Sequence, residues 1–90
     1  SATVSGAGGP WTVDFSVPAG TRACHVYISV YDILGRRVRV LLDAVMTAGS
    51  QRVQWDGVTQ HGGQAASGIY WIEMRADGRR ISGLKVLKMQ

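Results

Sequence analysis

The chain has 90 residues, enough for a single domain, and 46% of them are hydrophobic while 18% are charged. A domain of this size buries about 60–65% of the surface that its unfolded chain exposes, so it forms one thin core with little room for a deep substrate cavity. The composition excludes a disordered chain, which would contain fewer apolar and more charged residues.

The basic residues are spread along the chain. The chain contains ten Lys and Arg and six Asp and Glu, which gives a net charge of +4. Nucleic-acid-binding domains usually concentrate basic charge on one element, so we expect no nucleic-acid partner and interpret the charge as a solvated sheet face. One cysteine, Cys24, excludes an internal disulfide. No apolar run approaches the roughly 20 residues of a membrane helix, so we expect no membrane insertion.

A period of two between apolar and polar residues, the pattern of a half-buried strand, recurs along the chain. It predicts strands over residues 11–17, 24–31, 36–42, 51–56, 68–76 and 79–89, joined by short turns. Six or seven short strands with no room for crossover helices predict an all-β, antiparallel sandwich. The expected inward residues are Val13, Phe15, Val17, Val26, Ile28, Val30, Val38, Val40, Val53, Trp55, Tyr70, Ile72 and Met74.

Seven residues at turns and strand ends have expected roles that are purely structural. The Asp32 carboxylate caps its own turn, and Gly35 takes the left-handed position. Trp55 fills the core, and Tyr70 buries its ring while its hydroxyl bonds the backbone, as in a tyrosine corner. The full set is Asp32, Gly35, Trp55, Asp56, Gly57, Gly68 and Tyr70.

The order of these pieces resembles a known family. The segments are residues 30–38 (VYDILGRRV), 48–49 (AG), 53–57 (VQWDG), 62–63 (GG), 66–70 (ASGIY) and 85–88 (KVLK). Together they are similar to the immunoglobulin-like (Ig-like) domain of flagellar hook-capping proteins. They are equally similar to the C-terminal domains of exported bacterial proteins, some of which are sorting signals of the type IX secretion system. Many of those domains open with Asn-Pro, where this chain has Gly9-Pro10.

The resemblance implies an Ig-like sandwich over residues 11–90, preceded by a linker of small residues over 1–10. It also implies a C-terminal accessory module of a larger bacterial protein, secreted or held at the cell surface. The expected function is secretion sorting or cell attachment, with upstream domains of the same polypeptide and a component of the secretion apparatus or cell envelope as partners. A carbohydrate-binding module and a structural scaffold, as in hook capping, are the alternatives.

The side chains that could react or bind a metal form no catalytic, cofactor-binding or metal-binding pattern. A catalytic thiol needs a nearby base, but His25 follows Cys24 on a strand and points to the opposite face. His61 stands alone in a polar loop, and the carboxylates are too dispersed for a calcium loop. We therefore expect no enzyme activity and no cofactor.

The candidate partner-binding residues lie on faces that we expect to be exposed. Trp71 and Glu73 share an outward face with Arg37 and Arg39, while Tyr27 and Tyr31 face outward elsewhere. Exposed aromatic side chains either stack on sugar rings or cover Arg stems through cation–π contacts. The last strand adds two lysines beside an edge that a partner strand can extend. The candidates are Trp71, Arg37, Arg39, Lys85 and Lys88.

The absence of a metal pattern generates the first prediction. EDTA should leave the melting temperature of the isolated chain unchanged, because no group of side chains is expected to hold a structural ion. Differential scanning calorimetry with and without EDTA measures this. A drop of several degrees, reversed by calcium or zinc, would show a structural metal site.

Overall fold

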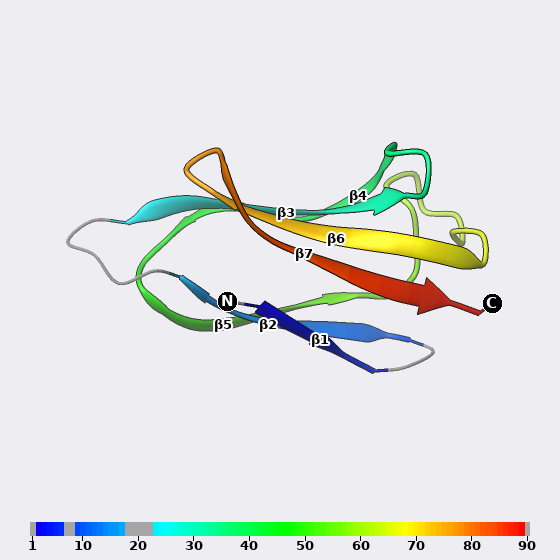
Figure 1. Cartoon of the computed structure of the whole chain (residues 1–90), viewed down its shortest axis with the longest axis horizontal. Coiled ribbons are helices and arrows are strands. Elements are labelled where there is room, and N and C mark those ends of the chain that lie inside the picture. Colours follow the sequence, from blue (N-terminus) through cyan, green and yellow to red (C-terminus); the bar gives the residue numbers. More distant parts are fainter. Residues whose placement is uncertain (1, 7–8, 18–22, 90) are drawn as a thin grey trace.

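Two antiparallel sheets pack face to face in the computed structural model, which describes residues 2–6, 9–17 and 23–89 (Figure 1). The three-stranded sheet has the order β1–β2–β5 and the four-stranded sheet has the order β4–β3–β6–β7. The seven strands are β1 (Ala2–Ser5), β2 (Trp11–Val17), β3 (Cys24–Asp32), β4 (Arg37–Met46), β5 (Gly49–Trp55), β6 (Gly68–Ala76) and β7 (Arg79–Lys88). The predicted antiparallel sandwich is confirmed.

The alternation in the sequence identifies most of the core correctly. Trp11, Val13, Phe15 and Val17 on β2 are buried while the residues between them are not. On the facing sheet the buried residues are Val26, Ile28 and Val30 of β3, together with Tyr70, Ile72 and Met74 of β6. Each fully buried side chain of this size contributes about 1.5–3 kcal/mol relative to its exposed state.

Three aromatic side chains link the two sheets at one end of this core. The rings of Trp11 and Trp55 stack with centroids 5.0 Å apart and an interplanar angle of 28°. Trp55 meets Tyr70 edge to face, with centroids 5.2 Å apart. The Tyr70 hydroxyl donates a hydrogen bond of 2.5 Å to the carbonyl of Ala66, so the expected tyrosine corner is present. Burial raises the pKa of Tyr70, and the negative charge of Asp32 adds to the effect.

Part of the expected linker is a strand. Ala2–Ser5 pairs antiparallel with the stretch Thr12–Phe15 of β2. Ala2 and Val4 pack against the core, while Thr3 and Ser5 are exposed. Four small residues carry too weak a pattern to predict a strand alone, and this one is stabilised by the sheet that it joins.

Two irregularities in the pairing of β3 with β4 change the expected faces. The register shifts between Ile28 and Ser29, and again between Val30 and Tyr31. An extra residue in one strand of a pair re-aims the side chains that follow it. Val40 therefore pairs with Ser29 and lies outside the core cluster, contrary to expectation, whereas Val38 packs against that cluster. Three further residues of β4 pack there as well: Leu41, Leu42 and Met46.

Ser29 is the second exception on these strands. Its alternation with the inward residues Ile28 and Val30 predicts an exposed position beside Tyr27 and Tyr31, but it is 0% exposed. Its Oγ is a buried polar atom without a hydrogen-bond partner among the described residues. It lies in the middle of the four-stranded sheet, opposite Val40 on one side and Glu73 on the other, so neighbouring side chains cover it.

The aromatic cluster generates a stability prediction. Trp55→Ala should lower the free energy of unfolding by about 3–5 kcal/mol, because it removes a fully buried ring and its contacts with both sheets. Trp71→Ala is the matched control: Trp71 is 43% exposed, and its loss should cost about 1 kcal/mol. Urea unfolding followed by circular dichroism measures both. Equal costs for the two variants would contradict the central position of Trp55.

Candidate interaction surface

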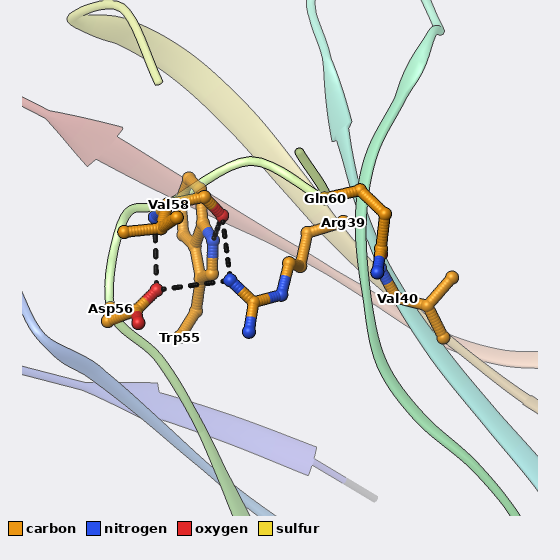
Figure 2. Close-up of polar contacts among 6 residues, drawn as sticks. All are labelled: Arg39, Val40, Trp55, Asp56, Val58 and Gln60. Carbon is orange, nitrogen blue, oxygen red and sulfur yellow. Dashed lines mark hydrogen bonds and ion pairs between the residues drawn. The ribbon is translucent and has the colours of Figure 1, made fainter. Parts of the chain in front are cut away.

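The turn after β5 is built around the indole of Trp55 (Figure 2). The indole Nε1 donates to the carbonyl of Val58 at 3.0 Å, and the Val58 amide donates to Asp56 Oδ1 at 3.0 Å. Gly57 between them has φ = 83°, a conformation that favours glycine. A Cβ there would also lie 2.9 Å from Cε of Lys88. The expected structural roles of Trp55, Asp56 and Gly57 thus share one cause, a tight turn closed over a buried ring.

The same turn holds Arg39, which we expected on the outer face with Trp71. Its Nη1 donates to the Val58 carbonyl at 3.2 Å and lies 3.5 Å from Asp56 Oδ1 (Figure 2). The expectation is wrong because the shifted register pairs Arg39 with the inward residue Val30. Arg39 is therefore a structural link between β4 and the loop after β5.

The loop of residues 57–68 also covers the free edge of β4 at Val38 and Val40. The backbone amide of Gln60 donates to the Val38 carbonyl at 2.9 Å. The backbone amide of Val40 donates to Gln60 Oε1 at 2.8 Å (Figure 2). These two bonds engage backbone groups that an edge strand would otherwise offer to another chain. Gly68, where the chain re-enters the sheet, has φ = 149°.

The hairpin between β3 and β4 is closed by Asp32, as expected. Its Oδ1 accepts hydrogen bonds from the amides of Leu34 at 3.0 Å and Arg36 at 2.9 Å, and its Oδ2 accepts one from Arg36 Nε at 3.0 Å. These bonds, the Arg36 amide first, hold the pKa of Asp32 below its ordinary value of 3.8. Gly35 has φ = 81° and donates its amide to the Asp32 carbonyl at 2.9 Å.

Three of the candidate partner-binding residues share the outer face of the four-stranded sheet. Trp71 pairs with Tyr31 on one side and Lys85 on the other, so the three side chains form a row across β3, β6 and β7. Arg37 also pairs with Tyr31, and its Nη1 donates to the Tyr27 hydroxyl at 2.8 Å. This face therefore carries Trp71, Lys85 and Arg37 together.

Lys88 does not belong to the exposed set. It is only 4% exposed, and its Cε lies against Gly57. Lys88 alternates with the exposed Leu87, and its partner in the register is Gly68, so its side chain is on the inward side of β7. A long aliphatic stem can be buried in this way while its charged end stays near the surface. The expectation that Lys88 is a surface charge is wrong.

Sequence reasoning missed the exposed apolar residues that surround this row. Ile33 and Leu34 at the tip of the β3–β4 hairpin are 71% and 73% exposed. Ile69 and Leu87, which pair with each other beside the row, are also exposed. A hollow of about 360 Å³ lies between Trp71 and the Asp32 turn, with Ile33 among its lining residues. The signal was available in the unusual pair Ile33-Leu34 within a turn.

The side chains of His25, Asp43 and Cys24, which could react or bind a metal, are engaged in structural contacts. His25 Nε2 lies 2.5 Å from Asp43 Oδ1 on an exposed face, whereas Cys24 packs against the core, so the two adjacent side chains point to opposite faces as expected. Among residues 2–6, 9–17 and 23–89, no three His, Cys, Asp or Glu side chains gather where they could hold a metal ion. No helix long and apolar enough to cross a membrane is found in the described part of the chain.

Comparison with known proteins identifies the family. The family model described as FlgD Ig-like domain matches residues 1–79, and the chain therefore belongs to this family. The match includes β1, which we had assigned to a linker, and it extends from there to the start of β7. No curated protein and no solved structure matches the chain significantly.

The Asp32 turn generates a prediction on pH. Because folding lowers the pKa of Asp32, the stability that its charge contributes is present above its ordinary value of 3.8 and is lost as the pH falls through the folded value. Asp32→Asn should therefore be less stable than the wild type at neutral pH, and the difference should narrow below pH 3.8. Urea unfolding of both proteins over a pH series measures this. A difference that does not change with pH would contradict the assigned role.

Proposed function

We propose that this member of the FlgD Ig-like domain family is a non-catalytic structural module that assembles with other proteins outside the cell, as a scaffold of the hook-capping kind. The family name supports the scaffold role, and it also supports a location at the flagellum. The scaffold was the alternative in our sequence interpretation, and the family match favours it over secretion sorting.

The observation that carries this proposal is where the large exposed apolar residues lie. Six of the eight that are described gather at the end of the sandwich formed by the β3–β4 hairpin, the start of β6 and the end of β7, the right-hand end in Figure 1. The other two are Val45, near the end of β4, and Ile81, near the start of β7. Contiguous exposed apolar surface rimmed by charge marks a protein interaction site more often than a solvated face. The six residues are Ile33, Leu34, Ile69, Trp71, Leu87 and Met89.

A carbohydrate-binding role has less support from the same surface. Sugar recognition beside an aromatic ring needs free polar groups to bond the hydroxyls, acceptors as well as donors. Lys85 beside Trp71 offers a donor, but the carboxylate acceptors are engaged. Near Trp71 the two oxygens of Glu73 already pair with Arg75 at 3.0 Å and Arg80 at 3.6 Å. The Asp32 carboxylate is engaged in its own turn. Type IX sorting stays a prediction from the sequence resemblance alone.

Deleting this domain from its parent protein in the native organism tests the proposal. Electron microscopy of the cells should show missing or misassembled hook structures, while the shortened parent is still exported. The sorting hypothesis expects the opposite, normal hooks and a parent protein that is no longer retained at the surface. Normal hooks in the deletion strain would contradict the scaffold role.

A matched pair of point variants distinguishes an effect on the contact surface from an effect on folding. Trp71→Ser removes the exposed ring and should disturb hook assembly, while the melting temperature falls by only about 4–8 °C and the domain stays folded. Val45→Ser removes an exposed apolar residue (70% exposed) from β4, which lies at the other edge of the same sheet, and should leave assembly intact. If Val45→Ser disturbs assembly as much as Trp71→Ser, the surface around Trp71 is not the contact.

A further inference from the structure

The two outer strands of the four-stranded sheet, β4 and β7, differ in whether another segment bonds their free edge. The loop of residues 57–68 bonds the backbone of β4 through Gln60, as described above. β7, at the other edge, has ten residues and pairs only with β6 among the strands described. A strand of this length has about 34 Å of edge, and β1 of the facing sheet approaches part of it. The unpaired amides and carbonyls of this edge are a template for another strand.

A hollow of about 460 Å³ runs beside this edge, between β7 and β1 of the facing sheet. Its β7 wall consists of Lys85, Val86, Leu87 and Met89, and Trp11 is among its other lining residues. The wall includes residues that alternate between the inner and outer faces of β7, so the hollow follows the edge of the strand itself. Its form suits an extended segment whose alternate side chains enter between the sheets.

The excess positive charge of the described residues is concentrated on the same strand. All six Asp and Glu side chains are already engaged: Asp14 with Arg52, Asp32 with Arg36, Asp43 with His25, Asp56 with Arg39, Glu73 with Arg75 and Arg80, and Asp77 with the His25 backbone amide. Four described basic residues have no carboxylate partner, and three of them, Arg79, Lys85 and Lys88, are on β7. The fourth is Arg37 on β4.

This charge disfavours a second copy of β7 as the occupant of the edge. β7 contains four basic and no acidic residues, so two copies paired edge to edge would bring like charges together. A segment with acidic residues on its outer face would instead meet Lys85, which is exposed and shares the outer face with Trp71. Its apolar residues, one position away, would enter the hollow beside Trp11 and Val86.

We propose that the β7 edge and the hollow beside it bind an extended segment of another polypeptide, in which acidic and apolar residues alternate, by adding it as a fifth strand to the four-stranded sheet. The inference rests on the assembly role proposed above and specifies the edge and the chemistry of the partner segment. Main-chain hydrogen bonds supply the affinity, and the alternation of side chains supplies the selectivity.

Fluorescence anisotropy with the 90-residue chain tests this inference. The probe is a labelled peptide of about ten residues that alternates Glu and Val, matched to the length of β7. It should bind at least about tenfold more tightly than a peptide that alternates Lys and Val, a difference of about 1.4 kcal/mol. Equal binding of the two peptides, or no binding of either, would overturn the proposal.

Matched variants locate the site. Lys85→Glu should weaken binding of the Glu–Val peptide about tenfold or more, whereas Arg37→Glu, the same charge change at the opposite edge, should change it less than about twofold. Equal effects would show attraction by net charge alone and would overturn the proposal. Sedimentation of the chain without peptide is the second check. A dimer that excludes the peptide would assign the edge to a second copy.

N-methylated peptides test the main-chain bonds. Methyl groups on every second amide should abolish binding when they lie on the amides that face β7, and should have little effect when they lie on the other set. If the peptide still binds when either set of amides is methylated, strand addition is overturned. If hooks fail in the deletion strain while no peptide binds, the assembly role stands and the strand-addition inference alone is wrong.

Discussion

The structure depends on the burial of one side chain, the indole of Trp55. Its ring is fully buried and lies between Trp11 of its own sheet and Tyr70 of the facing sheet. A buried indole N–H needs an acceptor, and the Val58 carbonyl supplies it. That requirement bends the chain sharply after β5, which in turn demands glycine at position 57. In a domain of 90 residues with a thin core, the loss of so large a buried ring removes a considerable part of the packing between the sheets.

The turn around Trp55 also determines which edge of the molecule is open. Because Val58 is held against the indole and Arg39, the following residues lie along β4, where Gln60 bonds its backbone. Nothing comparable is described beside β7, and the basic residues without carboxylate partners are mostly there. The packing of Trp55 thus determines the path of the loop, and the path of the loop determines where β4 is protected. The same arrangement leaves the surface around Trp71 and the edge of β7 as neighbouring contact regions.

Patterns that depend on local chemistry were predictable from the sequence, and those that depend on register were not. The alternation on β2 and β6, the Asp32 cap and the tyrosine corner of Tyr70 follow from side chains acting near their own position. Arg39 and Val40 were misplaced because two register shifts between β3 and β4 leave no mark in the sequence pattern. Ser29 was misplaced because side chains of the neighbouring strands cover it on the outer face. β1 was missed because four small residues form a strand only when β2 is present, and Lys88 because its stem is buried against a glycine from a distant loop.

The central claim is that this domain makes contacts through β7 and the neighbouring outer face when its parent protein assembles. Hydrogen exchange of the parent protein, free and within its isolated assembly, tests this most directly, because edge amides exchange quickly until another strand pairs with them. The account predicts new protection in residues 79–88, with little change in β4, where Gln60 already bonds the backbone at Val38 and Val40. Protection confined to β4 or to the three-stranded sheet, with β7 still exchanging as in the free protein, would contradict it.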